Sequence, residues 1–146
     1  MKKIIQKQLG ELLIENKTIT PEHLQTALEF QREKGGLIGQ ILVHLGYATD
    51  EEIAMALMSQ YGFPYLPLGG YEIDVQIAKL IPYEMAKRCG LVAVDRVGSI
   101  LTVAMANPLN SQAIEEVEAS TGFKVQIFVS TSADVIQALE RAYKAA

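Results

Sequence analysis

The sequence lacks paired cysteines for an internal disulfide, an apolar stretch that could span a membrane, and a recognisable signal peptide. Its single cysteine, Cys89, excludes an internal disulfide and fits a reducing compartment. No window approaches the ~20 consecutive apolar residues that span a bilayer. The apolar start of the chain is interrupted by Gln6, Lys7 and Gln8, unlike a signal peptide. We therefore expect a cytoplasmic protein.

Clustered positive charge is missing as well. The formal net charge is −4, and acidic residues outnumber basic ones in the first 60 positions. Binding to a nucleic-acid backbone depends on clustered lysine and arginine, so we expect no DNA or RNA partner.

Residues in the patterns typical of catalysis or metal binding are also missing. The chain contains no GxxxxGK[ST] loop and cannot hydrolyse ATP by that route. His23 and His44 are not spaced with Cys89 as metal ligands are, and we interpret them as ordinary, partly exposed side chains. We expect no enzymatic activity, no metal and no cofactor.

An internal repeat is the main positive feature of the sequence. Residues 8–31 align without a gap with residues 37–60, and the aligned identities include Gly10 with Gly39. In each repeat, apolar residues recur at the three- and four-residue spacing of an amphipathic helix. A second helix follows a short break, and Gly35-Gly36 joins the repeats. The pattern predicts two helix–turn–helix pairs.

Capping residues fix the start of the second helix in each repeat. In the first repeat Thr20 is the expected N-cap and Pro21 the first helical residue. In the second repeat Gly46 ends the preceding helix, Thr49 is the N-cap, and Glu52 completes a capping box.

Beyond the repeats the periodicity changes to that of a small sheet with helices. The two prolines of residues 62–70 exclude a helix interior there and predict an extended apolar connector that packs against the fold. The expected strands are Leu91–Val94, Ile100–Met105 and Lys124–Val129. The expected helices are Ile73–Leu80, Pro82–Arg88, one from Asn110 or Ser111 to Gly122, and one from Thr131 or Ser132 through Tyr143.

The fold class that follows is α+β. We expect a helical tandem-repeat subdomain over residues 1–61, the connector over 62–70, and an α/β subdomain over 71–146 with a sheet of three strands or slightly more.

The repeated glycines need an explanation, because glycine within a helix costs about 1 kcal/mol relative to alanine. Gly10 and Gly39 indicate a close approach to the backbone, either by a ligand or by a neighbouring helix, and both interpretations stay open. Gln31 and Gln60 end their repeats and can present an amide to a base edge or to water; on the residues alone, water is the simpler partner.

The tandem motif resembles the N-terminal domain of type II secretion and type IV pilus ATPases, in particular the MshE-type cyclic-di-GMP-binding domain. That family reads R-L-G-x-x-L followed by L-x-x-x-L-x-x-Q, twice over, and this chain reproduces the spacing at residues 8–31 and 37–60. The resemblance continues through AMANPLN at 104–110 and covers nearly the whole chain.

The resemblance implies a cyclic-di-GMP site built from both repeats. Leu9, Gly10, Ile38 and Gly39 would be backbone platforms for the ligand. Leu24, Leu28, Ile53 and Leu57 would pack on guanine and ribose, and Gln31 and Gln60 would reach polar edges. Gln8 occupies the position of the family's first arginine and lacks its charge and its fork of donors, so we expect weak binding or none.

Two roles are compatible with the resemblance. One is a second-messenger sensor that regulates an attached ATPase. The other is a docking module that anchors the ATPase to an inner-membrane platform protein without binding nucleotide. The resembling domains precede a catalytic ATPase domain, so the resemblance also implies a downstream ATPase domain as partner, and a location at the inner membrane through the platform protein.

Overall fold

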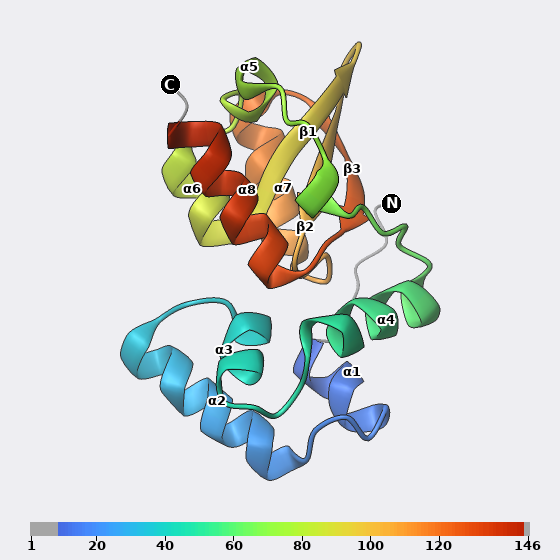
Figure 1. The fold of residues 1–146 in the computed structure, drawn as a ribbon, viewed down its shortest axis with the longest axis vertical. Helices are drawn as coiled ribbons and strands as arrows, with labels where there is room; N and C mark the ends of the chain where they lie inside the picture. The colour runs from blue at the N-terminus through green and yellow to red at the C-terminus, as the bar shows by residue number, and fades with distance from the viewer. Residues whose placement is uncertain (1–8, 145–146) are drawn as a thin grey trace.

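The chain folds into a helical half and an α+β half, which lie one above the other in Figure 1. The structure is a computed structural model and describes residues 9–144. The helical half contains α1 (Leu9–Glu15), α2 (Pro21–Lys34), α3 (Ile38–His44) and α4 (Asp50–Tyr61). The second half contains η1 (Leu68–Gly70), α5 (Val75–Ala78), α6 (Tyr83–Cys89), β1 (Leu91–Val97), β2 (Ile100–Met105), α7 (Ser111–Thr121), β3 (Lys124–Val129) and α8 (Ser132–Lys144). Among these elements, no helix has both the length and the apolar character needed to cross a bilayer.

The sheet has three strands in the order β1-β2-β3, which confirms the expected α+β class. β1 and β2 pair antiparallel as a hairpin, whereas β2 and β3 pair parallel with α7 between them in sequence. Helix α8 packs against β1 and β2, in front of the sheet in Figure 1, and α7 packs against β3.

Two predicted boundaries differ from the structure. β1 continues to Val97 beyond the expected end at Val94, because residues 95–97 pair with β2 after a register shift. The helix expected over Ile73–Leu80 is the single turn α5, which begins after Asp74 because its carboxylate accepts a hydrogen bond from the Gln76 amide at 2.9 Å.

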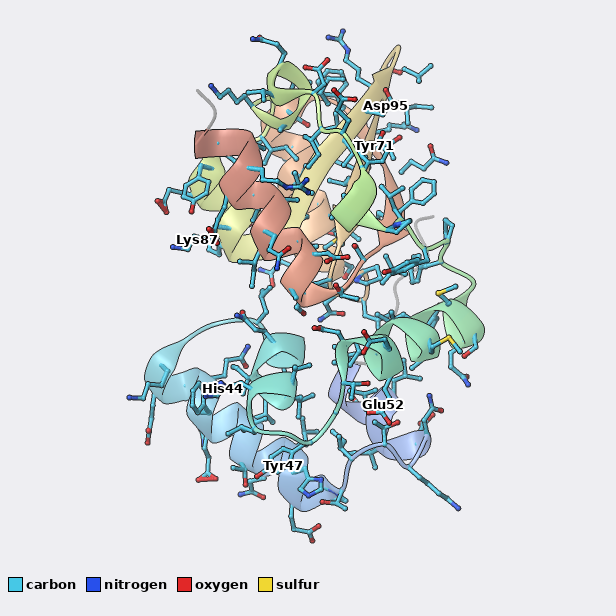
Figure 2. All side chains as sticks on the ribbon, in the orientation of Figure 1. His44, Tyr47, Glu52, Tyr71, Lys87 and Asp95 are labelled. Atoms are coloured by element: carbon cyan, nitrogen blue, oxygen red, sulfur yellow. The ribbon has the colours of Figure 1, made fainter. Side chains whose placement is uncertain are left out.

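The predicted caps form, and one of them carries an unforeseen partner. The Thr49 hydroxyl accepts from the Glu52 amide at 3.1 Å, and the Glu52 carboxylate accepts from the Thr49 amide at 2.9 Å, as a capping box requires. Thr20 makes the equivalent bond with the His23 amide, and His23 Nδ1 closes the box at 3.2 Å. The His23 ring stacks on Tyr47 of the second repeat, with centroids 4.1 Å apart, so this histidine joins the two repeats. Tyr47 is labelled in Figure 2.

The connector between the halves packs down as an added edge of the sheet. The Val129 amide donates to the Pro64 carbonyl at 2.8 Å, and the Leu66 amide donates to the Val129 carbonyl at 2.9 Å. Leu68, at the end of this segment, is fully buried in the core of the α+β half. These contacts hold residues 62–70 against β3.

Each half has an apolar core, and residues of the other half belong to that core or pack against it. The helical core is built on Leu12, Leu13, Ile41, Leu42 and Leu57, and it also contains Leu109 and Val129 from the α+β half. In return, Leu37, the first residue of the second repeat, packs against the core of the α+β half. The subdomain boundaries expected at residues 61 and 71 stay a prediction.

A pair of substitutions in α4 tests the helical core. Leu57 has no exposed surface, whereas Met55 on the same helix is 65% exposed. We expect Leu57→Ala to lower the free energy of unfolding by about 2–5 kcal/mol, because it removes buried methyl groups and leaves a cavity. Met55→Ala, the matched control, should change it by less than about 0.5 kcal/mol. Urea denaturation followed by circular dichroism measures both; equal effects would contradict this description of the core.

Candidate functional site

A groove of about 580 Å³ runs between the two halves. One wall comes from the helical repeats: Leu9, Gly10, Leu24, Leu28, Gln31 and Ile38. The other wall comes from the end of α6 and the β2–α7 loop: Arg88, Cys89, Asn107, Leu109, Asn110 and Ser111. The groove therefore exists only where segments distant in sequence meet.

The structure brings together part of the predicted ligand site. The predicted residues that line the groove are the six on the repeat wall, all from the first repeat or the first residue of α3. Gly39, Ile53, Leu57 and Gln60 are not among its lining residues. Gln8 lies outside the described residues. The binding roles assigned to all of these positions stay predictions.

Packing explains why Ile53 and Leu57 of the second repeat do not line the groove. Ile53 is 4% exposed and Leu57 is fully buried, so both belong to the helical core. Gly39 faces Leu9, Ile53 and the Ser132 hydroxyl of α8, which cover it. Gln60 is exposed near the end of α4. The two repeated glycines therefore do not line one shared groove.

Three glycines differ in what surrounds them. A Cβ at Gly10 would lie 2.5 Å from Leu24 Cδ1, so the glycine allows the Leu24 side chain of α2 to lie against α1. Gly10 also lines the groove. A Cβ at Gly39 would lie 3.5 Å or more from its neighbours, which is ordinary contact. Gly90 has φ +69° and would place a Cβ 2.5 Å from Leu37 Cδ1.

The polar groups of the repeat wall are few. The Gln31 side-chain amide donates to the Gly36 carbonyl at 3.0 Å, which ties the end of α2 to the segment joining the repeats. Leu28 is 42% exposed and gives the groove an accessible apolar surface beside this amide. This wall can therefore pack against a flat apolar ring and offer it a polar edge.

Arg88 of the opposite wall forms an ion pair with Glu116, which is not among the residues that line the groove. The Arg88 guanidinium donates two hydrogen bonds to the Glu116 carboxylate of α7, one of them from Nη1 to Oε1 at 3.0 Å. Hydrogen bonding to Arg88 lowers the pKa of Glu116, so the carboxylate is charged at neutral pH. Next to Arg88, burial raises the pKa of the Cys89 thiol, which opposes its use as a nucleophile.

This second wall could not be predicted from the repeat. Residues 88 and 107–112 lie far from the motifs in sequence, and no local pattern connects them. The only sequence signal for this wall was the N-cap of α7. The Asn110 side chain accepts a hydrogen bond from the Ala113 amide at 3.1 Å, so α7 begins beside the groove. Within residues 9–144, no group of three or more acidic, histidine or cysteine side chains is arranged to hold a metal.

Comparison with known proteins relates more than half of the chain to one kind of domain. Residues 61–146 match the MshEN domain. The type IV pilus assembly ATPase PilB of Myxococcus xanthus is 34% identical over 93% of this chain, and PilB of Thermus thermophilus is 34% identical over 94%. The chain spans only 24% and 16% of these relatives' lengths.

Solved structures with the same fold cover both halves of this chain. A structure of MshE with cdg has a TM-score of 0.67 at 24% identity, covering 94% of this chain and all of that one. The N-terminal domain of XpsE has a TM-score of 0.70 at 18% identity, covering 97% of each chain. At these identities the similarity shows the fold.

Alanine substitutions at the three glycines test the packing described above. Gly90→Ala should lower the free energy of unfolding by at least about 1–2 kcal/mol, because a Cβ is strained at positive φ and meets Leu37. Gly39→Ala should be neutral or stabilising by up to about 1 kcal/mol, since its Cβ meets only ordinary contacts. Gly10→Ala should fall between them because Leu24 must shift. Thermal unfolding gives the order, and a Gly39 variant as unstable as the Gly90 variant would contradict it.

Proposed function

The chain belongs to the MshEN domain family, and from that membership we propose that it is the regulatory N-terminal domain of a type IV pilus or type II secretion assembly ATPase and binds cyclic-di-GMP. In this proposal the domain is non-catalytic and acts in the cytoplasm on an ATPase domain that continues the chain. The PilB relatives, of which the chain matches a minor part, support the first statement. The similar MshE structure, solved with the dinucleotide, supports the second.

The observation that carries the proposal is the groove wall built from the first repeat. Leu9 and Gly10 bring backbone to the groove, Leu24 and Leu28 offer apolar side chains, and Gln31 offers an amide. A guanine base needs a flat apolar contact together with hydrogen bonds at its edge, which these residue types supply. A volume of about 580 Å³ lies within the range of about 300–1,000 Å³ that is common for ligand pockets.

Two features argue that binding is weak. Gln8 stands where the resembling domains have arginine, so the first repeat lacks that charge and donor fork. Ile53 and Leu57 of the second repeat are committed to the helical core and would have to leave it to contact a ligand. We therefore expect one repeat to provide most of the contacts on this wall.

The burial of the second repeat also favours a second candidate function, docking. Ile53 and Leu57 of the second repeat are buried in the helical core, so this repeat forms a rigid support, and a rigid support is suited to hold a partner protein. In this alternative the domain anchors the ATPase to an inner-membrane platform protein and needs no nucleotide.

Calorimetric titration with cyclic-di-GMP tests the sensor proposal. We expect a dissociation constant weaker than about 1 μM for the natural sequence, and a gain of at least about tenfold for Gln8→Arg, because the guanidinium restores charge and bidentate donors. Submicromolar binding by the natural sequence would refute the weakened site.

A variant on the groove wall separates the sensor from the docking role. Leu28→Asp places a charge on a side chain that is already 42% exposed, so the fold should persist while nucleotide binding is lost. Loss of binding with retained capture of the platform protein supports the sensor. Retained nucleotide binding with lost capture supports docking. Leu57→Asp is unsuitable, because a charge at this buried position would unfold the helical half.

A further inference from the structure

We infer that Arg88 is the groove's phosphate-binding residue and that Glu116 competes with the ligand for it. The inference rests on the proposed function, since it assigns to one residue of the second wall the anionic part of a dinucleotide. If Arg88 binds phosphate, both halves, and not the repeat wall alone, determine the affinity for the dinucleotide.

Charge in the groove points to Arg88. Among residues 9–144 that line the groove, Arg88 is the only cationic one, and Glu11 is the only acidic one. A cyclic dinucleotide carries two phosphodiester charges, and burying these beside apolar walls requires a cationic or multiple-donor partner.

The position of Arg88 lets it serve the groove from the opposite side. It lies in the last turn of α6, where α6 meets the groove, and its side chain is 60% exposed. It also lines a neighbouring cavity of about 600 Å³, so its long side chain stands at the junction of the two spaces. Exposure leaves the guanidinium room to turn from one partner to another.

The present partner of Arg88 resembles a phosphate in its geometry. Both nitrogens of the guanidinium fork bind the two Glu116 oxygens, as they would bind two phosphate oxygens. The pair is exposed to solvent on both sides, and exposed ion pairs contribute little to stability, so an anionic ligand can replace the carboxylate without a large loss to the fold. The lowered pKa of Glu116 keeps its charge in place to compete.

The consequence is an affinity set by competition. In the absence of ligand, Glu116 holds Arg88, and ligand phosphate must displace it. Removing the Glu116 charge should therefore strengthen binding, which a purely structural role of the ion pair would not do. This opposite sign for the two partners distinguishes the inference from a general weakening of the domain.

Calorimetry with cyclic-di-GMP on four variants tests it. We expect Arg88→Ala to weaken binding by at least about tenfold and Arg88→Lys by less, because lysine keeps the charge but not the fork. Glu116→Gln should tighten binding by about threefold to tenfold. Lys87→Ala is the matched control: Lys87 is the neighbouring cation on α6 (Figure 2) and does not line the groove, so affinity should stay within about twofold. To make weak binding measurable, the series is repeated in the Gln8→Arg background, with circular dichroism confirming the fold.

The outcomes separate the two levels of the argument. Binding by the natural sequence that Arg88→Ala leaves unchanged, or that Glu116→Gln weakens, overturns the role of Arg88 and leaves the proposed function intact. An equal loss in Lys87→Ala and Arg88→Ala overturns it too, since it reflects general charge. Absence of binding in every variant, Gln8→Arg included, overturns the proposed function and this inference together.

Discussion

The junction at which each half contributes to the other's core is the constraint on which the rest of the structure depends. β2 and β3 are parallel and end side by side at Met105 and Val129, so the chain leaves both strands at the same edge of the sheet. Val129, at the end of β3, and Leu109, in the β2–α7 loop, are buried among helical-half residues. Leu37 reaches the other way and covers Gly90. The groove lies along this junction, so its width follows from core packing.

The junction also explains why two similar repeats have different surroundings. The first repeat faces the β2–α7 loop across the groove, with Leu28 exposed. The second faces the start of α8, where Ser132 contacts Gly39. There burial raises the pKa of Asp50, and a hydrogen bond from the Ser132 backbone partly offsets the effect. The first repeat therefore forms an open groove wall, whereas the second repeat packs against α8. The two repeats differ in this way because the α+β half presents a different surface to each of them.

Local signals in the sequence were sufficient for most of the fold. The repeat register, the Thr49–Glu52 capping box and the strands β2 and β3 depend on residues close in sequence, and the structure confirms them. What could not be predicted depends on distant contacts. His23 completes a cap while stacking on Tyr47, and β1 extends because β2 pairs with it. Six of the positions predicted from the motif line one groove wall, whereas Gly39, Ile53, Leu57 and Gln60 do not. The other wall depends on tertiary packing, which places Arg88 and the β2–α7 loop.

The same packing decides what a ligand in the groove can do. A ligand that touched only the repeat wall would bind the helical half with little consequence for the α+β half. A ligand that also engages Arg88 contacts groups anchored in two different cores. By linkage, such a ligand stabilises the arrangement of the halves in which both contacts are made, by as much as its affinity for that arrangement exceeds its affinity for others. A cation on the second wall would therefore couple ligand binding to the arrangement of the two halves. A sensor that acts on an attached domain requires such coupling.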